Sequence, residues 1–179
     1  MPGDTTPREI ELRPRSPDDL ELLRRLLGDP RLTEHLGGPE SPEQLDARHQ
    51  RYIMLGSESN DRMFVFLAGP QRHAAGKIGY WEREWQGQPV WETGRSVLPE
   101  FQGRGIAARA TQLVVQAARA QNRHPLLLAF HAVDSAASNA ICQKAGFILQ
   151  AAVDFEYPRG HFMRCNDWRL DLLNSRRSN

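Results

Sequence analysis

Two closely spaced glycines, Gly103 and Gly105, lie in a segment whose residue types suit phosphate binding. Glycines let a backbone approach a phosphate without an intervening side chain, and the free N–H groups that begin a helix point at the anion. Arg104 adds a positive charge between them, and the small residues Ala107 and Ala108 permit close packing. The segment therefore predicts an anion cradle between a strand and a helix.

Two ligand classes use such a cradle. Gly103, Gly105 and Ala108 formally match the fingerprint of dinucleotide-binding folds, which would make the protein a nicotinamide-dependent oxidoreductase. The surrounding sequence disfavours this interpretation, because residues 99–102 separate the preceding strand from the glycines. The acidic ribose partner expected about 20 residues further on is also missing, since Asp134 comes late.

The elements that must position this segment can be read from caps and hydrophobic patterns. One helix is predicted to start at Ser16 as its N-cap, because a proline follows it and Asp19 comes three residues later. A second helix is predicted from Pro42 to Met54, with Ser41 as its N-cap. Further helices are predicted at 106–120 and 135–144. Apolar or alternating runs predict strands at 10–13, 63–68, 76–81, 91–98, 126–131, 147–153 and 162–172.

This element order predicts a single α/β (α+β) domain with a mixed, mostly antiparallel central sheet flanked by helices, because hairpins dominate the first half and one strand–helix–strand unit comes late. The expected boundaries are a flexible tail at 1–8, the domain at 9–173 and a second tail at 174–179. The strand that ends at Leu98 must stop pairing before the next helix starts, which leaves free backbone donors near the cradle.

Composition limits the classes of partner. The 179 residues include 23 basic and 22 acidic ones, so a net charge of +1 gives no basic footprint for nucleic acid. No apolar run approaches the roughly 20 residues that span a bilayer, and because residues 1–7 lack an apolar segment we expect no signal peptide. Cys142 and Cys165 are too few and too far apart for a disulfide framework or a metal site, so we expect free thiols in the cytoplasm and no metal.

Three segments together resemble the GNAT superfamily of N-acetyltransferases. Residues 91–107 resemble its main cofactor motif, and residues 138–147, with Ser138-Asn139 and a final Gly146-Phe147, resemble its second signature. Residues 10–20 resemble the opening of the branch that contains ribosomal-protein N-terminal acetyltransferases. The likeness extends from about Ile10 to Leu172 and implies a GNAT-like domain whose central sheet is splayed at the cofactor site.

The resemblance implies transfer of an acetyl group from acetyl-CoA to a primary amine, by direct attack on the thioester. A protein N-terminus, another peptide, a polyamine, an amino acid and an aminoglycoside all stay open as acceptors, as does a homodimer. The cofactor-binding residues that it implies are Val97, Gln102, Gly103, Arg104, Gly105, Ile106, Ala107 and Asn139. Backbone N–H groups of residues 102–107 would contact the pyrophosphate, and the backbone of Val97 would bind the pantetheine amide.

Amine acetylation needs a group that accepts a proton from the attacking ammonium, and the departing thiolate benefits from gaining one. The ribosomal-protein branch implies Glu156 as base and Ser138 as acid, while Glu92 is the alternative base because it shares a strand face with Gly94 and Ser96. His131 and His161 are further base candidates. Candidates to wall the acceptor pocket are Tyr80, Trp81, Trp85, Trp91 and Tyr157.

Two positions depart from the pattern of the superfamily. Cys142 stands where many members carry a tyrosine acid, and Phe130 stands where several carry a glutamate. The missing tyrosine leaves a second hypothesis open, in which the chain binds acyl-CoA as a non-catalytic module.

Overall fold

The computed structural model describes residues 9–174, in which strands from both halves of the chain form one sheet. The strand order is β1-β2-β3-β4-β5-β7-β6, and every neighbouring pair is antiparallel except β4 and β5. The predicted mixed, mostly antiparallel sheet is thereby confirmed. The predicted tail at 1–8, and all but Asn174 of the one at 174–179, lie outside the described residues. The strands are β1 (Ile10–Pro14), β2 (Arg62–Ala68), β3 (His73–Trp85), β4 (Gln88–Val97), β5 (Leu126–Ala132), β6 (Ile148–Glu156) and β7 (Phe162–Asp171).

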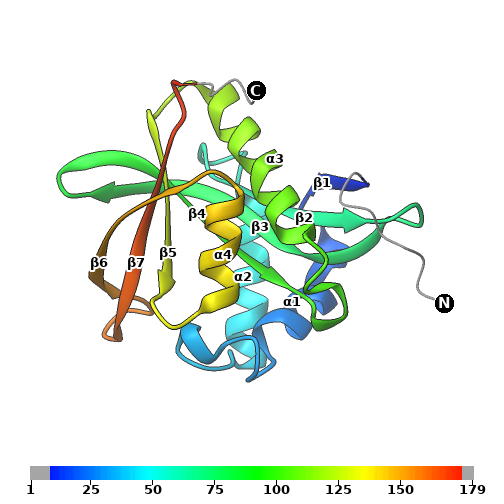
Figure 1. The fold of residues 1–179 in the computed structure, drawn as a ribbon. Helices are drawn as coiled ribbons and strands as arrows, with labels where there is room; N and C mark the ends of the chain where they lie inside the picture. Colours follow the sequence, from blue (N-terminus) through cyan, green and yellow to red (C-terminus); the bar gives the residue numbers. More distant parts are fainter. Residues whose placement is uncertain (1–8, 175–179) are drawn as a thin grey trace.

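Helices cover both faces of the sheet (Figure 1). On one face α3 packs its buried residues, among them Ile106 and Val114, against Trp91 of β4, and α4 contributes Cys142 to the same core. On the other face α1 contributes Leu23 and other leucines to a second core, with α2 alongside. The helices are α1 (Leu20–Leu27), α2 (Pro42–Met54), α3 (Ile106–Gln121) and α4 (Ala136–Lys144), with short 3-10 turns η1 (Pro17–Asp19), η2 (Glu34–Leu36) and η3 (Pro99–Phe101).

Both predicted cap segments begin helical structure. Ser41 caps α2 by accepting a hydrogen bond from the Gln44 amide at 3.3 Å, and the Gln44 side chain accepts one from the Ser41 amide at 2.8 Å. Ser16 precedes the turn η1, and its amide donates to the Asp19 carboxylate at 2.7 Å. These reciprocal bonds satisfy backbone donors that a helix start leaves free, which is why local sequence was sufficient to locate them.

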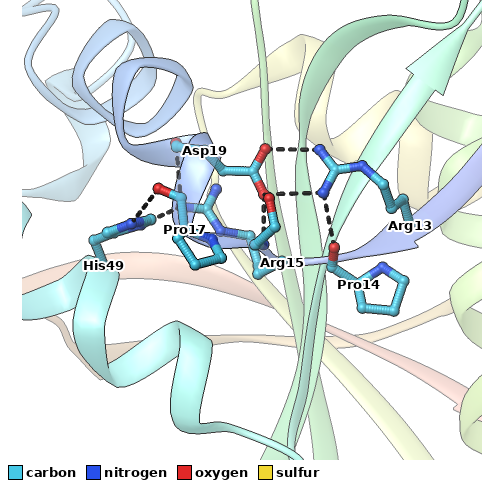
Figure 2. A network of polar contacts seen from close by, with 7 residues as sticks. Arg13, Pro14, Arg15, Pro17, Asp19 and His49 are labelled. Carbon is cyan, nitrogen blue, oxygen red and sulfur yellow. Dashed lines mark hydrogen bonds and ion pairs between the residues drawn. The ribbon is translucent and has the colours of Figure 1, made fainter.

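Figure 2 shows a polar network that joins the end of β1 to the turn η1, which precedes α1, and to helix α2. Arg13 pairs with Asp19 at 2.7 Å, and Arg15 donates to Nδ1 of His49 on α2 at 3.1 Å. Because an arginine only donates, Nδ1 of His49 accepts, and its Nε2 carries the proton that is donated to the Pro17 carbonyl at 3.1 Å. Burial opposes ionisation of Asp19, but the hydrogen bonds from Arg13 and Ser16 outweigh it and lower the pKa of this carboxyl.

The second strand of the first hairpin is longer than predicted. The sequence indicated 76–81, whereas β3 pairs with β4 from Gly76 to Trp85. The polar residues of this extension made it resemble a loop, and only the partner strand shows that it continues.

Among the described residues, no helix is long and apolar enough to cross a membrane.

We predict that Asp19→Ala lowers the free energy of unfolding by about 2–3 kcal/mol, because it removes the carboxylate that pairs with Arg13 and the negative charge near buried Arg15. Urea unfolding at neutral pH measures this. Asp18→Ala is the matched control, since Asp18 is exposed on the same turn. The lowered pKa of Asp19 means that its contribution is complete above the ordinary carboxyl range and is lost as the pH falls through the lowered value. Equal effects of the two variants would contradict the role of this network.

Candidate active site

Strands β4 and β5 pair at only two positions, Trp91 with Leu127 and Glu92 with Leu128. After Glu92, β4 stays paired with β3 as far as Val97, while β5 stays paired with β7 as far as Ala132. The two strands therefore diverge, and beyond this ladder their facing edges have no strand partner in the described part of the chain. We call the space between β4 residues 93–97 and β5 residues 129–132 the β4–β5 opening.

The register of β4 shows which backbone groups face this opening. The amide of Leu98 donates to the Ala75 carbonyl at 2.9 Å, which makes these two residues a hydrogen-bonded pair of the antiparallel ladder. Such pairs alternate along the ladder, so the N–H and C=O groups of Val97 and Arg95 point away from β3 and into the opening. The edge of β4 thus presents two amides to a ligand.

The glycine segment lies immediately beyond this edge. Gly103 and Gly105 both adopt left-handed conformations, with φ of 73° and 72°, and both are exposed. Gly105 is the N-cap of α3, and no side chain from residues 9–174 caps this helix. Among the described residues, the amides of Gly103, Arg104, Gly105 and Ile106 have no hydrogen-bond acceptor. A Cβ added at Gly103 would meet no atom within 4 Å, so the space in front of the segment is open.

Gln102 differs from the residues that follow it. Its amide already donates to the Pro99 carbonyl at 3.2 Å, and its side chain donates to the Val97 carbonyl at 3.1 Å. The donors free for an anion therefore begin at Gly103, and Gln102 connects the segment to the end of β4.

Glu92 lies at the last position where β4 pairs with β5, on the face opposite Trp91. Its side chain is buried, with the residue 8% exposed, and it pairs with Arg83 at 2.8 Å. Burial raises the pKa of Glu92, although the nearby charge of Arg83 opposes this shift. A buried carboxylate with a raised pKa at the mouth of an opening has the properties of a general base.

Aromatic side chains surround this ion pair. The Arg83 guanidinium lies 4.5 Å from the centre of the Phe155 ring, which stacks on Phe130 at 4.4 Å. Trp85 meets Phe130 edge-on at 4.7 Å. The aromatic residues proposed to wall an acceptor pocket are split between the faces, because Trp81 and Trp85 share the Glu92 face while Tyr80 and Trp91 are buried in the α3 core.

The two candidates on α4 differ in what their side chains do. Asn139 donates to the carbonyls of Ala132 and Ser135 at 3.0 and 2.9 Å, and its oxygen accepts from Asn166 and Trp168 at 3.0 and 2.8 Å. These four bonds use its full hydrogen-bonding capacity, so the side chain holds α4 to β5 and β7 and has no free atom for a cofactor. Ser138 presents its carbonyl to Arg95, and its hydroxyl has no hydrogen bond within the described chain.

Glu156 stands at the end of β6 and is exposed. One of its carboxylate oxygens accepts the amide of Gly160 at 2.7 Å and so closes the loop between β6 and β7. Tyr157 and His161 belong to the same loop, where the Tyr157 amide donates to the His161 carbonyl at 2.8 Å. These contacts give Glu156 a structural task that the sequence did not indicate.

Arg95 is a polar residue of the opening that the sequence interpretation passed over. Its Nη2 donates to the Ser138 carbonyl at 2.9 Å and lies 3.9 Å from the Cys142 sulfur, so the side chain reaches from β4 to α4. Its Nε and Nη1 are buried and, among the described residues, have no partner, as is also true of His131 Nε2 on β5. Burial, with the Arg95 charge, lowers the pKa of His131 to about 3, which makes His131 a weak base. The sequence did contain a signal for Arg95, since it places this charged residue on the same strand face as the apolar residues Trp91 and Val97.

A sheet that opens between two parallel strands, beside an uncapped helix N-terminus, is the arrangement that the sequence resemblance implied. Residues 9–148 match the family model of the acetyltransferase (GNAT) domain. The chain therefore belongs to the GNAT acetyltransferase family.

Solved structures share this fold at low sequence identity. The spermidine N-acetyltransferase of Vibrio cholerae, in complex with CoA and spermine, is 17% identical with a TM-score of 0.76. The alignment covers 93% of this chain and 99% of that protein's chain. The Salmonella typhimurium acetyltransferase that modifies the N-terminal serine of ribosomal protein L7/L12 is 21% identical with a TM-score of 0.76, covering 91% and 95%. A GNAT acetyltransferase of Bacillus anthracis is 14% identical with a TM-score of 0.77, covering 93% and 96%. No curated protein matches the chain in sequence.

We predict that Asn139→Ala lowers the free energy of unfolding by about 3 kcal/mol, because it leaves several polar groups between α4, β5 and β7 without partners. Ser138→Ala is the control, since the Ser138 hydroxyl has no bond to lose within the described chain. Chemical denaturation followed by tryptophan fluorescence compares the two variants. A loss for Asn139→Ala no larger than that of its neighbour would contradict the structural role.

Proposed function

We propose that this chain transfers the acetyl group of acetyl-CoA to a primary amine, with direct attack of the amine on the thioester. The observation that carries the proposal is the continuity of the uncapped α3 N-terminus with the β4–β5 opening. Free amides from Gly103 onward suit a pyrophosphate, and the exposed Arg104 adds positive charge. The unpaired edge of β4 suits the extended arm that follows the pyrophosphate in CoA.

The backbone of β4 has donors for both ends of that arm. The amide of Val97, nearer the glycine segment, is suited to a pantetheine carbonyl, and the amide of Arg95 is suited to the thioester carbonyl. An amide fixed in a ladder needs no reorganisation when negative charge develops on the carbonyl oxygen. We assign oxyanion stabilisation to Arg95 N–H on this ground.

Two carboxylates compete for the role of base. Glu92 is buried where the strands diverge, and its raised pKa suits proton transfer from an ammonium. Glu156 is exposed and bonded to Gly160. We propose Glu92 as the base, with Glu156 as the alternative and Ser138 as a donor near the opening.

We propose that the acceptor approaches on the α1–α2 face of the sheet, because Glu92 shares this face with Trp81. Arg15, Arg48 and Lys77 surround the ring of Tyr52, with their charged groups 5.7, 5.8 and 5.7 Å from its centre. Arg48 is paired with Glu40, whereas Lys77 is buried and has no acidic partner within the described residues. Clustered positive charge repels a polyamine. A protein N-terminus or a small molecule with a single amine is the acceptor that this face favours.

We predict that Gly103→Leu weakens acetyl-CoA binding by at least about tenfold, because the side chain would fill the space before the free amides. Gly87→Leu is the matched control: Gly87 has nearly the same φ, 75° against 73°, and equally open surroundings, but lies in the β3–β4 turn. Isothermal titration calorimetry with acetyl-CoA measures both. Equal affinities in the two variants would count against the phosphate site.

We predict that Glu92→Gln lowers kcat/KM by about 100-fold while acetyl-CoA affinity stays close to that of the parent. A base must be deprotonated, so the rate of the parent falls as the pH drops through the raised pKa of Glu92, above the usual value of 4.5, and this limb is lost in the variant. Release of CoA with a panel of amines gives the pH profile.

Glu156→Gln is the comparison variant, because glutamine keeps an acceptor for the Gly160 amide. Full activity of Glu92→Gln together with an inactive Glu156→Gln would transfer the role of base to Glu156. No turnover of the parent with any amine, despite tight binding of acetyl-CoA, would favour the non-catalytic module.

A further inference from the structure

The guanidinium of Arg95 lies where β4, β5 and α4 meet. Arg95 extends from β4 to the Ser138 carbonyl and the Cys142 sulfur of α4, and its charge acts on His131 of β5. The same residue presents its backbone amide to the β4–β5 opening. Its charged group and its amide therefore both belong to the part of the opening assigned to the thioester.

Within residues 9–174 this cation forms no ion pair with an acidic side chain. Its contacts are a carbonyl and a thiol, while Nε and Nη1 are buried without a partner within the described residues. The titratable groups around it are His131, which is neutral near pH 7, and Cys142, whose pKa burial raises. Keeping a buried charge unpaired is costly, so an anion that enters this site gains a strong interaction.

We propose that the Arg95 guanidinium stabilises the CoA thiolate that leaves during acetyl transfer, which makes Arg95 a catalytic residue through its side chain. The proposal rests on the acetyl transfer proposed above. It assigns to β4 the task that would otherwise need an acid on α4, where Cys142 is buried with its sulfur 3.9 Å from Arg95.

The step balances without a proton from Arg95. The amine nitrogen forms a bond to the thioester carbon, and the electron pair of the carbonyl moves to its oxygen. As that carbonyl re-forms, the carbon–sulfur bond breaks and sulfur keeps the electron pair as a thiolate. The proton of the amine goes to the base, and the thiolate accepts hydrogen bonds from Arg95 until it takes a proton from solvent.

Other side chains near the opening are less suited to this task. His131 carries no charge near neutral pH because its pKa is about 3. The Ser138 hydroxyl is neutral, and Arg83 lies on the opposite face, paired with Glu92. Arg95 alone among these groups is a cation with free donors on the α4 side of β4.

The decisive experiment measures the pKa of the CoA thiol when CoA is bound to the unmodified protein, by ultraviolet absorbance of the thiolate as the pH is raised. We expect this pKa to lie at least about one unit below that of free CoA, as for thiols beside arginine. Desulfo-CoA, which lacks the sulfur, is the blank for the spectrum. A bound thiol with the pKa of free CoA overturns the proposal, and this measurement needs no variant.

Arg95→Met removes the charge at similar length. We expect the shift of the thiol pKa to disappear, kcat to fall by about 100-fold and KM for acetyl-CoA to change little. CoA should lose affinity relative to desulfo-CoA, whereas a purely structural role would weaken both alike. Arg95→Lys, which keeps the charge, is expected to restore part of the pKa shift, and the absence of any recovery contradicts the proposal.

Arg119→Met is the matched control, because Arg119 also donates to a carbonyl, that of Leu172 at 2.8 Å, near the far end of α3. It should leave the thiol pKa unchanged. If CoA and acetyl-CoA both fail to bind the unmodified protein, the proposed acetyl transfer is wrong. If both bind and amines are acetylated while the thiol pKa stays at its free value, only the role of Arg95 is wrong.

Discussion

The separation of β4 from β5 is the constraint on which the candidate site depends. One short parallel ladder, ending at Glu92, interrupts a sheet that is otherwise antiparallel. Both strands are held independently, β4 by β3 and β5 by β7, so the opening between them is a fixed feature and not a frayed edge. Trp91 is fully buried and meets Tyr80 edge-on at 4.9 Å, and it fixes the part of β4 that pairs with β5 against the α3 core. An open strand edge is thereby kept ready for a ligand with amide groups of its own.

Alternation along β4 gives the two faces of this opening opposite chemistry. Glu92 and Arg95 are three residues apart, an odd spacing that directs their side chains to opposite faces of a strand. The carboxylate lies among the aromatic residues around Arg83, and the guanidinium lies toward α4. A slip of one residue in the β3–β4 register would exchange them, so the ladder that builds the sheet also separates the proposed base from the site proposed for the thiolate.

Polar contacts join helix α4 to three strands of the sheet. Asn139 bonds it to β5 and β7, and Arg95 bonds it to β4 through the Ser138 carbonyl. These contacts connect the two strands that border the opening through α4. At the end of β4, the opening is bordered by η3 and the start of α3. Asn139, a residue of the second signature, thus uses its side chain to hold the geometry of the candidate site.

The amino-acid sequence by itself determined the features that depend on neighbours along the chain. The caps at Ser16 and Ser41, the left-handed turn at Gly103 and Gly105, the start of α3 and the mixed character of the sheet all follow from local propensity and from the order of the elements. Tertiary structure alone decided the use of individual polar atoms: the saturation of Asn139, the loop contact of Glu156, the burial of Glu92 and the unpaired charge of Arg95 beside His131. The physical reason is that a hydrogen bond or a desolvation cost depends on which distant segments pack together, and sequence spacing does not contain that distance.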